Sequence, residues 1–109
     1  MYHRADRAES RVAEAALGEL MDTVVRMDGA TAARMTFEPG WKWSDHNAAS
    51  AGTPLCHAPH TGVVLSGHGV VQYEGGERVD LLPGQAFHIT STPHDSWVEG
   101  GEPYVSLHV

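Results

Sequence analysis

Turn signals recur about every 8–12 residues over most of this chain, and that spacing limits its fold more than any other feature. The pairs Pro39-Gly40, Ser66-Gly67, Gly75-Gly76 and Pro83-Gly84 each close a short apolar or alternating run. Runs this short suit strands and leave no room for long helices. The spacing predicts an all-β fold, a small antiparallel β-barrel or jelly roll.

Alternation of apolar and polar residues predicts which side of each strand faces the core. Asp28-Gly29 is typical of a hairpin turn between Leu20–Met27 and the strand that follows. The predicted inward positions are Ala33, Met35 and Phe37, then Phe87 and Ile89, then Val105, Leu107 and Val109. His88 and His108 lie at the opposite parity, and His68 lies in a turn. We therefore expect these three histidines at the surface or in an interface.

The length of 109 residues allows one hydrophobic core. Residues 19–109 are expected to form a single barrel domain. Residues 1–18 are expected to form an arm or a short helix, because Ala5, Ala8, Val12 and Ala15 have helical spacing and Gly18 could end the helix.

Charge and composition exclude several classes of function. The formal net charge of −7 argues against nucleic-acid binding, which needs a basic face. No apolar run approaches the roughly 18 residues of a membrane span. The stretch from Met1 to Glu9 is charged and does not resemble a secretory signal. A single cysteine, Cys56, fits a reducing interior, so we expect the cytoplasm.

Histidine is the residue type in excess, with eight in the chain. Neutral imidazole is a frequent metal ligand, so this excess favours a metal site, while the simpler alternative is that several of these histidines are surface residues. The chain contains no nucleophile elbow, phosphate-binding loop or dinucleotide fingerprint.

Several segments resemble the motifs of cupins. Five residues separate Gly40 from His46, and six separate His60 from Gly67 in HTGVVLSG. The stretch LLPGQAFHI resembles the strand that enters the second cupin motif, and His94 in TPHDSW resembles its histidine. PGWKWSDH, AGTPLCHAPH and GVVLSG resemble a group of stand-alone bacterial cupins.

The resemblance implies a metal site, with departures. Ala48 replaces the second histidine of the usual pair, and His60 replaces the usual glutamate. Thirteen residues separate His46 from His60, so a long loop or a hairpin is expected between them. The implied ligands are His46, His60 and His94. The metal would be zinc or iron, with nickel, manganese or copper as alternatives.

Cys56 shares a face with His60 if the segment between them is extended, whereas His57 points the other way. Cys56 is therefore a candidate fourth ligand, or else a small buried apolar residue.

Other residues are candidates for the surroundings of the site. Trp41, Trp43 and Trp97 are expected either to line a pocket or to pack in the core or a dimer contact. Asp45 and Asp95 flank proposed ligands; each is a candidate proton carrier or orienting group, or else a turn residue.

Three functions follow as hypotheses. The first is a metal-dependent dioxygenase, isomerase, lyase or cyclase acting on a small organic molecule. The second is a non-catalytic module that senses a small ligand or metal, and the third is a barrel that has lost its metal, as Ala48 suggests. Exposed strand edges predict a homodimer.

Overall fold

The computed structural model describes residues 7–10, 14–16, 19–27 and 30–109, and the predicted turn Asp28-Gly29 lies outside them. Ten strands and two very short helices confirm the all-β prediction. The strands are β1 (Arg7–Ser10), β2 (Glu14–Ala16), β3 (Glu19–Met27), β4 (Ala30–Phe37), β5 (His60–Ser66), β6 (Gly69–Tyr73), β7 (Arg78–Leu81), β8 (Ala86–Ile89), β9 (His94–Val98) and β10 (Tyr104–His108).

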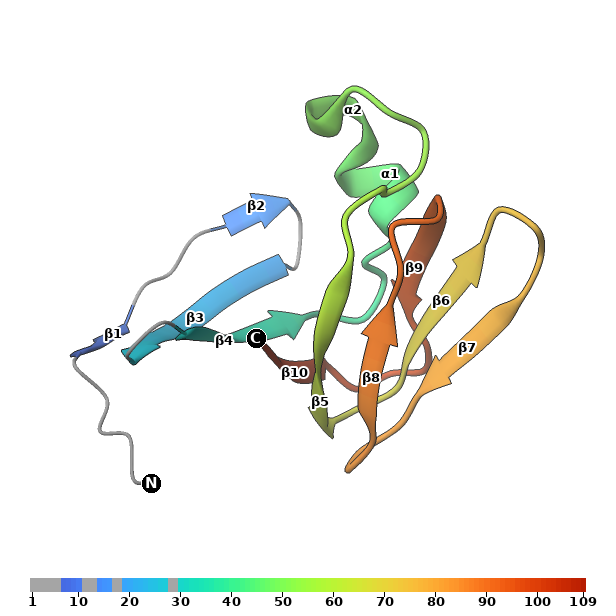
Figure 1. Cartoon of the computed structure of the whole chain (residues 1–109). Helices are drawn as coiled ribbons and strands as arrows, with labels where there is room; N and C mark the ends of the chain where they lie inside the picture. The colour runs from blue at the N-terminus through green and yellow to red at the C-terminus, as the bar shows by residue number, and fades with distance from the viewer. Residues whose placement is uncertain (1–6, 11–13, 17–18, 28–29) are drawn as a thin grey trace.

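The strands form two antiparallel sheets that enclose the interior (Figure 1). The larger sheet runs β1-β3-β4-β10-β5-β8, with β2 also paired to β3. The smaller sheet runs β7-β6-β9. Strands β1 to β3 extend beyond the barrel at one side of Figure 1, so the interior lies between β4, β10, β5 and β8 on one side and the smaller sheet on the other.

Each strand from β4 to β10 contributes one residue to the main hydrophobic cluster of the core. These residues, together with Trp41 from the loop after β4, are Phe37, Val64, Val71, Leu81, Ile89, Val98 and Tyr104. The predicted inward positions Phe37 and Ile89 are confirmed, and Met35 and Phe87 pack against the same cluster.

Of the expected arm or short helix at the N-terminus, the described parts form strands. Residues 7–10 of β1 and 14–16 of β2 each pair with β3. A short, mostly alanine stripe buries little area as a helix, whereas pairing with β3 satisfies the backbone of both segments. Ala5 and Val12 of the predicted helix lie outside the described residues.

Strand β10 has the opposite parity to the predicted one. Tyr104 and Ser106 are buried at 6% and 0% exposure, while Val109 is 79% exposed. The aromatic ring of Tyr104 packs in the core beside Phe37, with ring centroids 5.9 Å apart. A tyrosine ring buries more apolar area there than a valine could. His108 shares the parity of Tyr104 and Ser106 and consequently turns inward, against the expectation of a surface position.

The segment between His46 and His60 is partly helical, where a loop or hairpin was expected. Helix α1 (Trp43–His46) and helix α2 (Ala48–Ala51) lie at one end of the barrel in Figure 1. Gly52 ends α2 in the left-handed conformation, at φ 77°. Glycine adopts this conformation without strain. No helix within the described ranges is long and apolar enough to span a membrane.

Candidate metal centre

Three potential metal ligands meet at the end of the barrel near the helices. The ligand atoms of Cys56, His60 and His94 all lie within 4.8 Å of one another. Cys56 precedes β5, His60 is the first residue of β5, and His94 is the first residue of β9. Cys56 and His94 are buried at 7% and 1% exposure, and His60 is partly buried. The group is therefore internal, and His60 is its most exposed member.

Backbone pairing brings these residues together. Cys56 N–H donates to the carbonyl of His94 at 2.8 Å, and His94 N–H donates to the carbonyl of Cys56 at 3.0 Å. His60 pairs with Ile89 on β8. Cys56 and His60 lie on the same side of an extended segment, as residues an even number apart do. The distance from Cys56 Sγ to His60 Nε2 is 3.7 Å.

The donor set fits a transition metal. In a tetrahedral site with zinc bond lengths, a sulfur and a nitrogen ligand are separated by about 3.6 Å, close to the distance between Cys56 Sγ and His60 Nε2. His94 Nδ1 lies 2.8 Å from the carbonyl oxygen of Thr92. That contact fixes the proton on Nδ1 and leaves Nε2 unprotonated, with a lone pair that can bind a metal. Thiolate and imidazole suit zinc, iron, nickel or copper better than magnesium or calcium, so the group could hold one such ion.

The imidazole of His60 is held in the neutral form that a metal ligand requires. Burial lowers the pKa of His60 to about 4, and the neighbouring rings of His108 and His94 contribute to this lowering. The centroid of the His60 ring is 5.6 Å from that of His94 and 5.8 Å from that of His108. Burial also lowers the pKa of His108.

A cavity of about 190 Å³ opens beside His60. Its wall includes His108 and a large set of apolar residues, among them Phe37, Leu81 and Phe87. Tyr104 also lines it, and burial raises the pKa of Tyr104 to about 12, so the phenol is neutral at physiological pH. The cavity and the ligand group share His60, so a molecule in the cavity would lie next to the group.

Several solved structures are similar to this chain in fold. No protein-family model and no curated protein matches the chain. A protein of unknown function (DUF1255) from Acidithiobacillus ferrooxidans superposes with a TM-score of 0.65 at 19% identity, over 99% of this chain and 93% of that one. KdgF from Halomonas sp. gives 0.58 at 20% identity, over 90% and 82%. EutQ from Clostridium difficile gives 0.53 at 11% identity, over 90% and 79%.

These likenesses and the two-sheet barrel settle the fold. It is a small two-sheet barrel of the cupin type. The resemblance seen in the sequence motifs is thus confirmed at the level of fold, while identities of 20% or less carry no activity from these neighbours to this chain.

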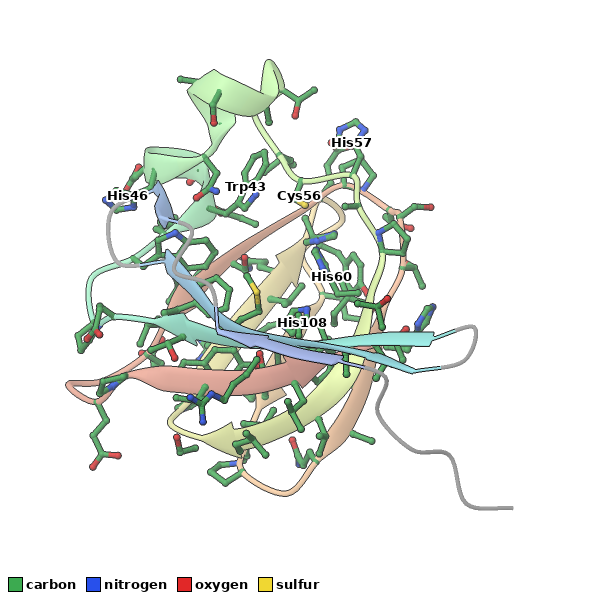
Figure 2. All side chains as sticks on the ribbon, turned by 90° about the vertical axis from the view of Figure 1, so that its left-hand side faces the viewer. Trp43, His46, Cys56, His57, His60 and His108 are labelled. Atoms are coloured by element: carbon green, nitrogen blue, oxygen red, sulfur yellow. The ribbon has the colours of Figure 1, made fainter. Side chains whose placement is uncertain are left out.

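The structure does not bring His46 into the ligand group of this cupin-type barrel. His46 ends α1, where its Nδ1 lies 3.1 Å from the backbone nitrogen and 2.9 Å from the carbonyl oxygen of Lys42. Figure 2 shows it beside the helix, apart from Cys56 and His60. The potential ligands that the structure brings together are Cys56, His60 and His94. The parity argument for Cys56 and His60 agrees with this geometry, and His57 is exposed.

The two aspartates lie away from the ligand group. Asp45 is exposed on α1. The Asp95 carboxylate accepts hydrogen bonds from the Ser44 backbone N–H at 3.0 Å and the Ser44 hydroxyl at 2.7 Å, and lies 3.8 Å from Lys42 Nζ. Asp95 thus links α1 to β9 through Ser44.

The three tryptophans all border the cavity, in different ways. Trp41 is buried in the core and its indole N–H donates to Asn47 Oδ1 at 3.1 Å. Trp43 packs against the core from α1. The Trp97 indole lies toward the outside, where its N–H donates to Glu99 at 2.8 Å and Lys42 Nζ is 5.4 Å from its ring centroid.

His108 is the site residue that sequence reasoning missed. The alternation of Val105, Leu107 and Val109 predicts that these three residues face inward and that His108 faces outward. Figure 2 shows His108 just below His60, in the interior. The alternating set Tyr104, Ser106 and His108 was the available signal, since it has an aromatic residue at one end and a histidine at the other.

Proposed function

We propose that this cupin-type protein is a metal-dependent enzyme acting on a small organic molecule. Cys56, His60 and His94 would hold one divalent ion, zinc or iron in the first instance. The observation that supports this most directly is the position of His60, which belongs both to the ligand group and to the cavity wall. Three protein ligands leave coordination positions for water or substrate, as in catalytic rather than structural sites.

The metal, its ligands and the cavity wall would have different roles in such a reaction. The metal would supply Lewis-acid polarisation of an oxygen on the substrate. The hydrogen bond between His94 and Thr92 orients one ligand ring, and the buried Cys56 keeps the thiolate away from bulk water. The apolar cavity wall excludes water around the bound molecule, which strengthens polar interactions there.

A non-catalytic binding module is the second candidate, and one observation favours it. Among residues 30–109, no Asp or Glu side chain borders the cavity. Asp95 is committed to Ser44, and Asp45 is exposed, so neither supplies a carboxylate beside the ligand group. If the barrel only binds, metal and ligand will bind without turnover.

Metal content tests the ligand set. Untagged protein should take up close to one zinc or iron ion per chain, measured by elemental analysis after dialysis. Cys56→Ser, His60→Ala and His94→Ala should each lower the occupancy severely. His57→Ala is the matched control, because it removes an exposed histidine from the same segment and should keep full occupancy. A wild-type protein that remains metal-free when offered these ions would refute the proposal.

A spectroscopic experiment separates an open site from a closed one. Cobalt-substituted protein should change its visible spectrum on addition of azide, because an open coordination position accepts an external ligand. Turnover of diketones, enols or catechols under oxygen by the iron-loaded protein would identify a dioxygenase, whereas anaerobic turnover would identify an isomerase, lyase or cyclase. An unchanged cobalt spectrum would contradict the enzyme proposal.

The homodimer stays a prediction. Strand β8 ends the larger sheet, and β7 ends one side of the smaller one. Unpaired edges of this kind favour association with a second copy. Light scattering at high micromolar concentration should give twice the mass of one chain, and the mass of a single chain would refute it.

A further inference from the structure

We propose that the cavity takes a small, uncharged ring compound that is mainly apolar and presents one hydrogen-bonding group to His108. This rests on the proposed function in one respect, namely that the cavity beside His60 is the substrate site. It goes further by naming the class of molecule and the residue that recognises its polar end.

The size of the cavity sets the scale of the molecule. An engineered apolar cavity of about 150 Å³ holds a benzene molecule. The cavity here has a volume of about 190 Å³, so it has room for one ring with a few further atoms.

The chemistry of the wall selects an uncharged molecule. Of the described residues that border the cavity, none is an aspartate, glutamate, lysine or arginine. The wall is instead rich in rings and branched chains, including Phe37, Trp41, Phe87 and Ile89. A carboxylate or phosphate would lose its hydration there without gaining an ion pair, which is costly, whereas a neutral ring gains contact with the aromatic faces.

His108 is one of the polar residues of this wall, together with Asn47, His60, Ser96 and Tyr104, and it is fixed in place. Its Nε2 lies 2.8 Å from the hydroxyl oxygen of Ser106, a fully buried residue. Its ring also meets the rings of His60 and Phe87 edge-on, with centroids 5.8 and 5.7 Å away. Ser106 therefore occupies one ring nitrogen, and the other is available to a group in the cavity that His108 borders.

The arrangement orients a bound ring. A hydroxyl or carbonyl oxygen that hydrogen-bonds to His108 lies beside His60 as well, because the two imidazoles are neighbours. The apolar remainder of the ring then fills the space between Phe37 and Leu81 on opposite walls. An orientation with the oxygen toward the ligand group is the one that a metal-dependent reaction on that oxygen requires.

Ligand-observed fluorine NMR with three matched probes tests the inference. The probes are 4-fluorophenol, 4-fluorotoluene and 4-fluorobenzoate, titrated into chelator-treated protein. We expect 4-fluorophenol to bind about fivefold more tightly than 4-fluorotoluene, as one hydrogen bond provides. We expect 4-fluorobenzoate to bind about tenfold more weakly than 4-fluorophenol, because its carboxylate finds no ion pair. Tighter binding of the benzoate, or equal affinity for phenol and toluene, would overturn the inference.

Variants assign the preference to His108. His108→Ala should remove the advantage of 4-fluorophenol while 4-fluorotoluene still binds, which also shows that the cavity persists. His108→Gln, which keeps a hydrogen-bonding group, should restore part of the advantage if His108→Ala is too unstable to study. His88→Ala is the control on the outer face of β8, where His88 Nδ1 lies 2.7 Å from the Thr61 hydroxyl. An unchanged preference in His108→Gln and His108→Ala alike would contradict the role of His108.

Metal-free protein keeps this test separate from the proposed function. Selective binding of 4-fluorophenol by a protein that takes up no metal would sustain the ligand class and refute the metal-dependent enzyme. If the protein takes up one metal ion per chain but binds none of the neutral rings, the proposed metal site would be sustained and the proposed ligand class would be refuted.

Discussion

Strand β9 places His94 and Asp95 next to each other in sequence but on opposite faces. His94 turns into the barrel, where it is 1% exposed and joins Cys56 and His60. Asp95 turns outward and accepts hydrogen bonds from Ser44. The parity of a single strand therefore separates a residue suited to metal chemistry from one that anchors a helix.

The histidines show the same contrast between inside and outside. Inside, burial and neighbouring imidazoles keep the pKa of His60 low, at about 4. Outside, His68 Nε2 lies 2.8 Å from Asp80, and Arg78 lies 3.0 Å from the same carboxylate. The hydrogen bond from Arg78, followed by that from His68, lowers the pKa of Asp80. The interior thus holds a neutral imidazole, His60, whereas the solvated surface holds the paired charges of Asp80, Arg78 and His68.

The largest expected difference between the two faces is in apolar packing. Ile89 is 2% exposed in the core. Ile89→Ala should therefore lower the free energy of unfolding by about 2–5 kcal/mol. Leu65 is 45% exposed, so Leu65→Ala should change it by only about 0.5 kcal/mol or less. Urea unfolding followed by circular dichroism measures both, and equal losses for the pair would show that the inner face is not the main source of stability.

Acidification should destabilise the metal-free protein through His60. Its pKa is about 4 when folded, against 6.5 when unfolded. Above pH 6.5 the ring is neutral in both the folded and the unfolded state, so it does not change the free energy of unfolding. As the pH falls from 6.5 to about 4, the unfolded chain takes up a proton that the folded chain resists, so stability is lost. The partly buried ring makes this loss on the order of 2 kcal/mol.

Unfolding curves at several pH values measure this loss. His60→Gln should reduce the dependence between pH 6.5 and about 4, because the neutral amide takes up no proton, and the part due to His108, whose pKa burial also lowers, should remain. His57→Gln leaves His60 in place and should therefore keep the loss. A wild-type protein whose free energy of unfolding is constant over this range would contradict the buried, neutral state of His60.

A smaller effect is expected on the outer face of β9. Asp95→Ala removes the carboxylate that accepts from the first turn of α1, and losses of this kind of cap are about 1 kcal/mol. Metal content should stay at the wild-type value, because Asp95 is not in the ligand group. Asp45→Ala, on the exposed side of the same helix, should change neither property. Loss of metal in Asp95→Ala would show that the outer face of β9 affects metal binding on its inner face, against the separation described above.

The fold was predictable from sequence because local signals agreed with it. Turn pairs such as Pro83-Gly84 and the alternation of Phe87 and Ile89 need no long-range information, and both match the structure. The parity of β10 was not predictable in the same way. Val105 and Leu107 offered one alternation, Tyr104 and Ser106 offered another, and only the packing of Tyr104 against Phe37 decides between them.

The candidate site was predictable in part. His60 and His94 follow from motif spacing, and Cys56 follows from strand parity with His60. His46 lies outside this group because it ends α1, where its ring contacts Lys42, and the residues that follow form α2 before the chain reaches His60. Local spacing cannot reveal such an excursion, because whether two distant residues meet depends on the path of the chain between them.

The smallest expected effect concerns the outer charges. Asp80→Asn weakens the pairs with Arg78 and His68, both at the solvated surface, where paired charges contribute little. The melting temperature should fall slightly at low salt, and the difference should vanish at about 1 M salt, where the screening length is roughly 3 Å. Glu77→Gln makes the same change of charge at an exposed position and corrects for net charge alone. A loss in Asp80→Asn that persists at high salt would mean that Asp80 acts through packing or directed hydrogen bonds, and the contrast between a neutral interior and a screened exterior would no longer hold.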